Sequence, residues 1–389
     1  MAIPLSYNMR NIRQRPISTL TTAIGIALTV AIFIGSLSLA SGFQASLIET
    51  GDDANVIVLR KGADSEIASG VDRETSNIIR ANPAIAVGPS GRPLVSSEMV
   101  VVTNRDRLGQ PGSSNVLVRG VDPEALELRS SVRIVEGRMF EPGTDEVIVG
   151  HRIVPRFADC EIGDRIRFQQ RAFTVVGHFE AEGSAFESEI WGDNATLQPA
   201  LQRGGGFQSI TFRLRDRSGF AALEKELEGD PRFALQLHRE SAWYADQSGL
   251  LATTIRVLGV LITVIMALGA VFGAMNTMYA AVQSRTREIA TLLVLGFSPL
   301  AVMVSFMAES VLLALLGGVL GCLFALPING IVTSTTNFAS FSEVAFAFRV
   351  TPAVLLAGMI FAAGMGVVGG FLPALKAARQ PLAGSLRGA

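Results

Sequence analysis

Long stretches without a charged side chain recur along the chain, at residues 16–48, 257–284, 289–308, 310–342 and 350–375. A helix that crosses a bilayer needs about 20 predominantly apolar residues. The pattern therefore predicts four membrane-spanning helices, at residues 18–41, 253–282, 298–331 and 352–375. The first run imitates a signal peptide, because arginines precede it and small residues end it. It is longer than the roughly 7–15 residues of a secretory apolar region, so we expect a retained anchor.

The direction of these helices follows from lysine and arginine in the short flanks, which stay on the cytoplasmic side. Three flanking segments are basic, at residues 1–17, 283–297 and 376–389. If four helices cross, these segments share one side of the membrane. We therefore expect both termini in the cytoplasm, with residues 42–252 and the loop 332–351 outside.

Residues 42–252 alternate short strand-like runs with turn signals. Strands are predicted at 55–60, 93–102, 209–214 and 233–238, and helices at 74–83 and at 218–229 with Ser218 as N-cap. Between 114 and 200 only strand signals occur, with Gln169 and Gln170 as a hairpin turn. The predicted fold is a membrane protein with four transmembrane α-helices and a large α/β extracytoplasmic domain inserted between helices 1 and 2. An α/β subdomain (54–103 plus 205–240) would carry a β-rich subdomain (104–204).

Small residues and one acid stand out in the predicted spans. Glycines four residues apart let helix backbones approach closely in lipid; the pairs are Gly269 and Gly273, Gly317 and Gly321, and Gly366 and Gly370. Glu309 is the one acid well inside a span, where it either has a function in the membrane or lies near a helix end and pairs with a neighbour. The second helix exceeds the bilayer, because 28 uncharged residues rise about 42 Å against a hydrocarbon core of ~30 Å. Tilt would absorb some of the excess, and a stalk that continues into the external domain would absorb the rest.

The composition agrees with a membrane protein. Of the 389 residues, 49% are hydrophobic and 17% are charged, whereas soluble domains carry about 25% charged residues. A formal net charge of -1 provides no basic field for nucleic acid. Cys160 lies in a polar region and Cys322 in an apolar run, so we expect no disulfide.

Patterns typical of catalysis or cofactor binding are missing from the sequence. The three histidines have no metal-ligand spacing, and there is neither a G-x-S-x-G elbow nor a G-x-x-x-x-G-K-S/T phosphate loop. We expect no catalytic residue, metal or cofactor on this chain. If it uses the energy of ATP, another polypeptide binds the ATP and its Mg²⁺. The acids Glu187, Glu189 and Asp193 are expected on a solvated face, with the binding of a partner as the alternative.

Several segments follow one another in a recognisable order. They are the basic entry RNIRQRPISTLTTAIGIALTVA, the external phrases IVEGRMFEPGTDEVIVGHRIV and IGDRIRFQQRAFTVVGHFE, the helix end and short helix NTMYAAVQSRTREIATLLVLGFS, and the closing GGFLPALKAARQPLAGSLRG. In this order they resemble permeases of the FtsX/MacB family, the membrane subunits of type VII ABC transporters with a MacB-like external domain.

The resemblance implies a homo- or heterodimer of permeases with cytoplasmic ABC ATPase subunits. A coupling helix in residues 283–297 would sit in a groove of the ATPase. That role falls to Arg285, Thr286, Arg287, Glu288, Ile289, Leu292 and Gly296. Ile289, Leu292 and Leu293 would form an apolar face, while Arg285 and Glu288 can pair or reach a partner. Ser284, Ala290 and Leu293 depart from the family pattern and leave the helix more apolar.

The family's mechanism suits a chain whose spans carry almost no polar lining. ATP hydrolysis by the partner would move the external domain (mechanotransmission) and drive export or extraction of a lipid, peptide, lipoprotein or drug-like substrate. A periplasmic adaptor and an outer-membrane channel are possible further partners, and the bacterial cytoplasmic (inner) membrane is the expected location. The alternative is an FtsX-like transducer that regulates an extracytoplasmic cell-wall hydrolase. A membrane-anchored receptor without an ATPase would leave the RTREI stretch unexplained.

Overall fold

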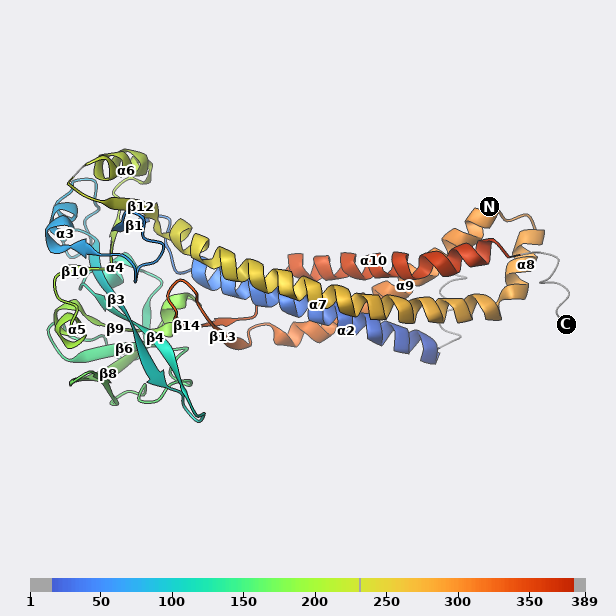
Figure 1. Cartoon of the computed structure of the whole chain (residues 1–389), viewed down its shortest axis with the longest axis horizontal. Helices are drawn as coiled ribbons and strands as arrows, with labels where there is room; N and C mark the ends of the chain where they lie inside the picture. Colours follow the sequence, from blue (N-terminus) through green and yellow to red (C-terminus); the bar gives the residue numbers. More distant parts are fainter. Residues whose placement is uncertain (1–15, 231, 381–389) are drawn as a thin grey trace. The chain divides into compact units, whose positions relative to one another are not determined.

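The computed structural model describes residues 16–230 and 232–380 (Figure 1). By their contacts these residues divide into two units. Residues 16–41, 253–331 and 348–380 form the helical unit, and residues 42–230, 232–252 and 332–347 form the sheet unit. The predicted N-terminal segment 1–17 and tail 376–389 lie largely outside the described residues.

Among the described residues, four helices are long and apolar enough to cross a membrane. They are α2 (Pro16–Ile48), α7 (Glu240–Ser284), α9 (Pro299–Ala325) and α10 (Pro352–Ala378), with the short α8 (Thr286–Val294) after α7 and the 3-10 turn η3 (Leu326–Ile328) after α9. α2 ends at Ile48 rather than 41, and α7 begins at Glu240 rather than 253. With 45 residues, α7 is about 68 Å long. The excess over the bilayer is therefore larger than predicted.

α9 and α10 begin in the same way. Ser298 and Thr351 accept a hydrogen bond from the N–H three residues on, at 3.2 Å from Ala301 and 3.3 Å from Val354. A proline follows each cap, and its fixed φ suits the first helical position. The helices thus begin within one residue of the starts predicted at 298 and 352, whereas α9 ends at Ala325 rather than 331 and α10 at Ala378 rather than 375.

Four of the six predicted packing glycines lie at helix contacts. A Cβ added at Gly317 or Gly321 would stand within 2.7–2.9 Å of α2, and one at Gly366 or Gly370 within 2.5–3.1 Å of Ser310 on α9. At the other predicted pair, Gly269 and Gly273, an added Cβ would meet no described atom within 4 Å, so the close contact expected there is absent from the described chain. α7 instead approaches α2 through Gly259, where an added Cβ would stand 2.5 Å from Ser36.

The sheet unit is built on one mixed ten-stranded sheet, in the order β12-β1-β11-β3-β4-β9-β6-β8-β5, with β7 paired to β8. The pairs β4–β9 and β6–β8 are parallel. The strands are β1 (Asn55–Arg60), β3 (Val95–Asp106), β4 (Ser113–Val121), β5 (Arg133–Gly137), β6 (Glu146–Gly150), β7 (Arg165–Phe168), β8 (Arg171–Glu180), β9 (Glu189–Asp193), β11 (Ser209–Arg213) and β12 (Leu235–Arg239).

Strand β3 joins the two predicted subdomains. Its residues 95–98 pair with β11 and its residues 99–106 pair with β4. The predicted boundary between 103 and 104 therefore falls inside a strand, and the two parts share one sheet. Each part keeps its own apolar cluster, which for the first part includes Val56, Ile210 and Phe212.

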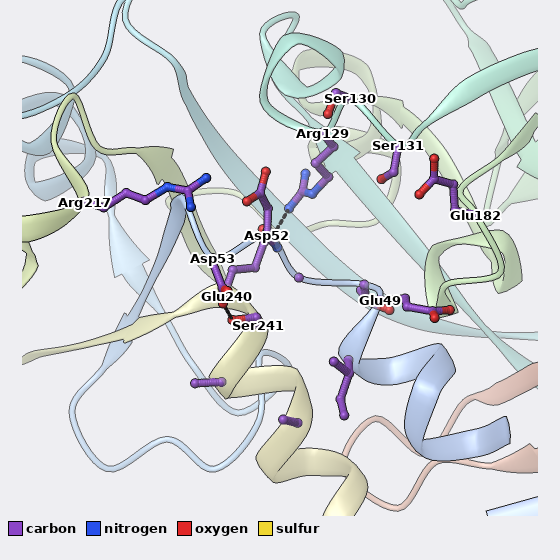
Figure 2. Close-up of a pocket in the computed structure, with 15 residues that line it drawn as sticks. Glu49, Asp52, Asp53, Arg129, Ser130, Ser131, Glu182, Arg217, Glu240 and Ser241 are labelled. Atoms are coloured by element: carbon purple, nitrogen blue, oxygen red, sulfur yellow. Dashed lines mark hydrogen bonds and ion pairs between the residues drawn. The ribbon is translucent and has the colours of Figure 1, made fainter. Parts of the chain in front are cut away.

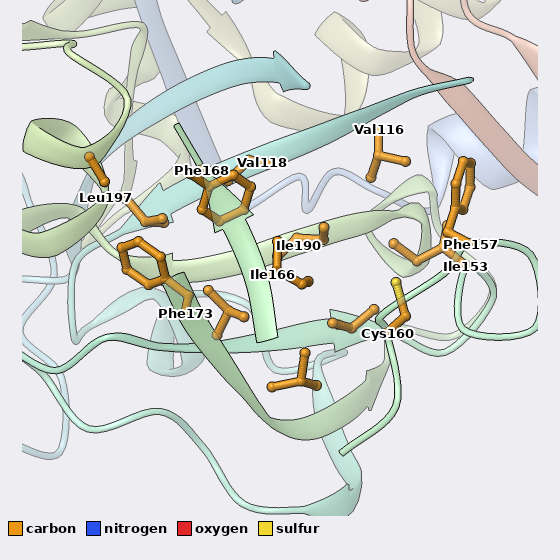
Figure 3. Close-up of a cluster of buried hydrophobic side chains, with 14 of the residues drawn as sticks. Val116, Val118, Ile153, Phe157, Cys160, Ile166, Phe168, Phe173, Ile190 and Leu197 are labelled. Carbon is orange, nitrogen blue, oxygen red and sulfur yellow. The ribbon is translucent and has the colours of Figure 1, made fainter. Parts of the chain in front are cut away.

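The apolar cluster of the second part surrounds the β7–β8 hairpin (Figure 3). Ile166 of β7 and Phe173 of β8 pack with Val118 of β4 and Ile190 of β9. Cys160 is buried in the same cluster, and its thiol is free. Burial raises the pKa of this thiol to about 11.

The remaining elements of this unit are short. They are β2 (Val71–Asp72), α3 (Arg73–Arg80), α4 (Ala125–Leu128), η1 (Ala185–Ser188), α5 (Asn194–Ala200), β10 (Gly206–Phe207), η2 (Arg217–Gly219) and α6 (Phe220–Gly229). α4 and α5 contradict the prediction of strands alone between 114 and 200. These helices were missed because their 4 and 7 residues are too few to show a helical period in the sequence. Ser218 is not the N-cap of α6: its N–H donates to Asp216 at 2.9 Å within η2. Gln169, with φ of 53°, forms the predicted turn between β7 and β8.

Residues 332–347, predicted as part of an external loop, form the hairpin β13 (Val332–Thr336) and β14 (Glu343–Ala347). This hairpin belongs to the sheet unit. Glu343 pairs with Arg156 at 2.6 Å and also with Arg107, and the N–H of Ala345 donates to Ser188 at 2.9 Å. The connection between α9 and α10 therefore folds together with residues 42–252.

Candidate functional site

The candidate coupling helix α8 ends in a glycine cap. Gly296 has φ of +94°. Its N–H donates to the carbonyl of Leu293 at 3.2 Å, and the N–H of Phe297 donates to the carbonyl of Leu292 at 3.1 Å. These two bonds are a Schellman motif, which needs the left-handed backbone that glycine adopts readily. Gly296 therefore turns the chain from α8 toward α9.

α8 has a buried face and an exposed face. Ile289 is 1% exposed and Ala290 is 2% exposed, whereas Arg287 and Glu288 are exposed. Ile289 packs with residues of α7, α9 and α10, namely Met278, Val282, Val302, Phe306, Ala374 and Ala377. The apolar face thus anchors α8 on its own chain, and the exposed face carries one basic and one acidic side chain.

Arg285 differs from the other two charged residues predicted for coupling, because its side chain is buried. It is the single non-helical residue between α7 and α8. Its Nη1 lies 3.1 Å from Oε2 and 3.3 Å from Oε1 of Glu309 in α9, and the two residues are 6% and 7% exposed. Of the two interpretations of Glu309, the structure shows pairing with a neighbour. Thr286, next to Arg285, donates its hydroxyl to the carbonyl of Gln283 at 2.8 Å.

A second charged cluster lies in the interior of the sheet unit. Arg119 of β4 is 1% exposed and donates to three carboxylates at 2.7–3.1 Å, those of Glu66, Glu98 and Glu189. Arg129 donates to Glu98 at 3.0 Å and to Glu240 at 3.3 Å. Because Glu240 is the first residue of α7, this buried network ties the start of α7 to strands β3, β4 and β9.

The buried network contains four carboxylates but only two guanidiniums. The arginines therefore do not compensate every carboxylate equally, and the pKa values of the glutamates shift in different directions. Burial raises the pKa of Glu189 and of Glu240, and the nearby arginines offset this only in part. Burial acts in the same direction on Glu66, but the charge and hydrogen bonds of Arg119 outweigh it and hold the pKa of Glu66 below its ordinary value. As the pH falls, Glu189 and Glu240 therefore take up protons before Glu66.

A pocket of about 700 Å³ opens beside the start of α7 (Figure 2). Acidic side chains outnumber basic ones on its wall, with Glu49, Asp52, Asp53, Glu182 and Glu240 against Arg129 and Arg217. Much of this charge is paired within the chain: Asp52 with Arg213 at 2.8 Å, and Glu240 with Arg129. In the described part of the chain no three His, Cys, Asp or Glu side chains are grouped so that they could hold a metal ion.

The acids predicted on a solvated face are buried, so that prediction is wrong. Glu187 pairs with Arg152 at 2.7 Å, Glu189 pairs with Arg119, and Asp193 accepts the N–H of Gly143 at 2.7 Å. All three acids are at most 6% exposed. Their partners lie far away in the sequence and were not recognisable there.

Comparison with known proteins identifies the family. The MacB-like periplasmic core domain family matches residues 19–230, and the FtsX-like permease C-terminal family matches residues 260–382. The chain belongs to the FtsX/MacB family of ABC transporter permeases.

Two relatives illustrate the extent of the similarity. The macrolide export ATP-binding/permease protein MacB of Neisseria gonorrhoeae is 22% identical over 383 residues, which cover 93% of this chain and 57% of that protein. MacB 1 of Yersinia pestis bv. Antiqua is 30% identical over 238 residues, which cover 59% of this chain and 35% of that protein. This FtsX/MacB permease chain thus spans little more than half the length of the Neisseria relative.

Among solved structures, the periplasmic region of MacB from Actinobacillus actinomycetemcomitans aligns with 49% of the FtsX/MacB permease chain. The alignment covers 90% of that region, with 13% identity and a TM-score of 0.36.

Sequence reasoning missed the buried network of this FtsX/MacB permease. One signal was available: Arg119 interrupts the apolar run NVLVRGV, and Glu98 interrupts VSSEMVVV. A charged side chain inside a central strand is seldom buried without a partner. The partners themselves come from the loop after β1, from β9 and from α7, and no local pattern connects them.

Proposed function

We propose that this chain is the non-catalytic permease subunit of an ABC transporter, and that α8 is the helix on which a cytoplasmic ATPase subunit docks. The observation that carries the proposal is the construction of α8. Its apolar face is fixed on α7, α9 and α10, while Arg287 and Glu288 remain exposed. Because its apolar face is packed on the other helices, α8 can bind a partner through its charged face without losing these internal contacts. ATP and Mg²⁺ would be bound by that partner.

The packing of the sheet unit supports the membrane topology of this proposal. Residues 42–252 and 332–347 fold into one unit, which supports a topology in which the connections from α2 to α7 and from α9 to α10 would lie on the same side of the membrane. If all four helices cross, α8 and both termini lie on the opposite side. The arginines near α8 support a cytoplasmic location for that side, and the sheet unit would then lie outside the inner membrane of a bacterium.

The work would be mechanical. ATP binding and hydrolysis would move α8, and α7 would carry the movement to the sheet unit. The continuity of α7 over 45 residues and the attachment of Glu240 to the buried network support this route. The substrate class would be a lipid, peptide, lipoprotein or drug-like molecule that is exported or extracted by a permease dimer. The relatives named for macrolide export support export. A periplasmic adaptor and an outer-membrane channel would be further partners in this proposal.

The alternative of an FtsX-like transducer that regulates a cell-wall hydrolase is less well supported. The MacB-like periplasmic core domain family matches residues 19–230, which include most of the sheet unit. The regulatory alternative offers no account of that match.

Charge reversal on α8 tests the docking proposal. The double variant Arg287→Glu with Glu288→Arg keeps the composition of α8 and inverts the charges offered to a partner. A matched control is Lys225→Glu with Glu226→Lys, an exposed pair on α6 of the sheet unit. After purification in mild detergent, the ATPase should be lost from the α8 variant and retained by the control. Full retention by both variants would contradict the proposal.

A further inference from the structure

The corner between α7 and α8 is bonded to both helices. The N–H of Arg285 donates to the carbonyl of Val282 in α7 at 3.2 Å, and its carbonyl accepts the N–H of Ile289 in α8 at 3.0 Å. Its backbone, with φ of -113° and ψ of 18°, is the only break between the two helices. Any change in the angle between α7 and α8 therefore has to pass through this residue.

The side chain of Arg285 crosses to a third helix. Glu309, its partner, lies about three turns into α9 and is 7% exposed. The next residue, Ser310, donates its hydroxyl to the carbonyl of Gly366 in α10 at 2.8 Å. One turn of α9 thus holds both the corner of α8 and helix α10.

Apolar packing closes around this corner. Met278 and Val282 of α7, Val302 and Phe306 of α9, and Ala374 of α10 form one cluster with Ile289 of α8. Opposite charges attract more strongly in such surroundings than in water, and the loss of Glu309 would leave the guanidinium of Arg285 buried without its carboxylate. The pair therefore resists separation when α8 is pushed.

We propose that Arg285 and Glu309 are positioning residues that lock the α7–α8 corner to α9, so that a displacement of α8 moves α9 and α10 together with α7. The inference rests on the proposed function of α8. It assigns to Arg285 a role inside the chain, in place of the contact with the ATPase that resemblance suggests. The nucleotide signal then reaches the whole four-helix unit and not α7 alone.

The test uses the full chain with its co-purified ATPase in lipid nanodiscs. Cys322 of α9 serves as a native probe, because Cys160→Ala removes the other of the two cysteines. The rate of alkylation of Cys322 by a small maleimide is measured with ADP and with ATP plus vanadate. In the Cys160→Ala background the two rates should differ. In Glu309→Gln and in Arg285→Gln they should become equal, while the ATPase still co-purifies.

Rescue separates positioning from a general loss of structure. The charge swap Arg285→Glu with Glu309→Arg should restore the difference between the two rates, and Arg285→Lys should keep it if the swap does not fold. Lys376→Gln is the control: it removes a contact between α10 and Tyr279 of α7 at 5.2 Å without touching the corner, and should leave the difference intact.

Two results would overturn the inference. One is that the alkylation rates already coincide with ADP and with ATP plus vanadate in the Cys160→Ala background. The other is that Glu309→Gln retains the full difference. If no ATPase co-purifies with the unmodified chain, the proposed function itself fails, and this outcome is distinct from both.

Discussion

Replacing Arg119 with methionine removes the central donor of the buried network and keeps a side chain of similar length. Arg119 makes five hydrogen bonds to Glu66, Glu98 and Glu189. In the variant these three carboxylates remain buried, and Arg129 still reaches Glu98 alone among them. The substitution therefore leaves negative charge in the interior without compensation.

The size of the effect follows from that burial. Removing one partner of a buried ion pair costs about 3–5 kcal/mol of unfolding free energy, because the remaining charge is unpaired. For a folding unit of about 150–250 residues, each kcal/mol changes the melting temperature by roughly 2–4 °C. We therefore expect the sheet unit of the Arg119→Met variant to melt about 6–20 °C below the unmodified protein.

The assay is thermal unfolding of the detergent-solubilised full chain, followed by tryptophan fluorescence. The sequence contains two tryptophans, and both lie in the sheet unit. Trp191 donates its indole N–H to Glu189 at 2.7 Å, so it reports on the network directly. Arg171→Met is the control, because Arg171 pairs with Asp145 at side-chain exposures of 43% and 38% and should cost at most about 1 kcal/mol. Equal melting temperatures for the two variants would refute the reasoning.

Three further predictions concern packing, capping and thiol reactivity. Gly366→Leu should prevent α9 and α10 from packing and reduce the yield of monodisperse protein. Gly364→Leu on the same helix should be tolerated, because a Cβ added at Gly364 would meet no described atom within 4 Å; equal yields would contradict the assigned contact. Asp72→Ala should lower unfolding stability by about 0.5–2 kcal/mol, because Asp72 caps α3 through the N–H of Thr75 at 2.7 Å. Hydrogen bonds from Thr75 lower the pKa of Asp72, so this contribution is present above the carboxyl's unfolded pKa and is lost as the pH falls through the folded pKa; a difference in melting temperature from Asp72→Ala that does not shrink in acid would contradict it. Cys160, with a pKa raised to about 11, should react slowly with Ellman's reagent at pH 8 in a Cys322→Ala background. A reaction as fast as that of a small thiol in solution would contradict the burial of Cys160 in its apolar cluster.

Much of the helical unit could be predicted from the sequence, because a span is recorded as a continuous run of uncharged residues. Caps such as Ser298-Pro299 and Thr351-Pro352 also mark the helix starts. A stalk beyond the bilayer was predicted from the length of the second span, but its start at Glu240 was not. Residues 240–252 are polar enough to resemble the end of a domain, and they are helical because they pack in the sheet unit, where Trp243 and Tyr244 are buried.

The candidate site was only partly visible in the sequence. The position of α8 follows from the RTREI motif, whereas Gly296 was predicted only as a coupling residue and its capping role comes from the structure. The burial of Arg285 does not follow from a local pattern, because its partner Glu309 lies 24 residues further on in another helix. The network around Arg119 could not be predicted from local patterns, since its six members come from six separate segments. Charged residues inside apolar runs signal that partners exist, and only the fold identifies them.

Site-specific cross-linking from α8 tests the central claim most directly. A photoreactive amino acid replaces Glu288, and the same substitution at Glu226 on α6 serves as the control. The account predicts a nucleotide-sensitive adduct, from position 288 alone, to a polypeptide that binds ATP and carries a G-x-x-x-x-G-K-S/T loop. The absence of any cross-linked adduct from position 288 in cells that contain the assembled transporter would contradict the account. The same adduct from position 226 would contradict it as well.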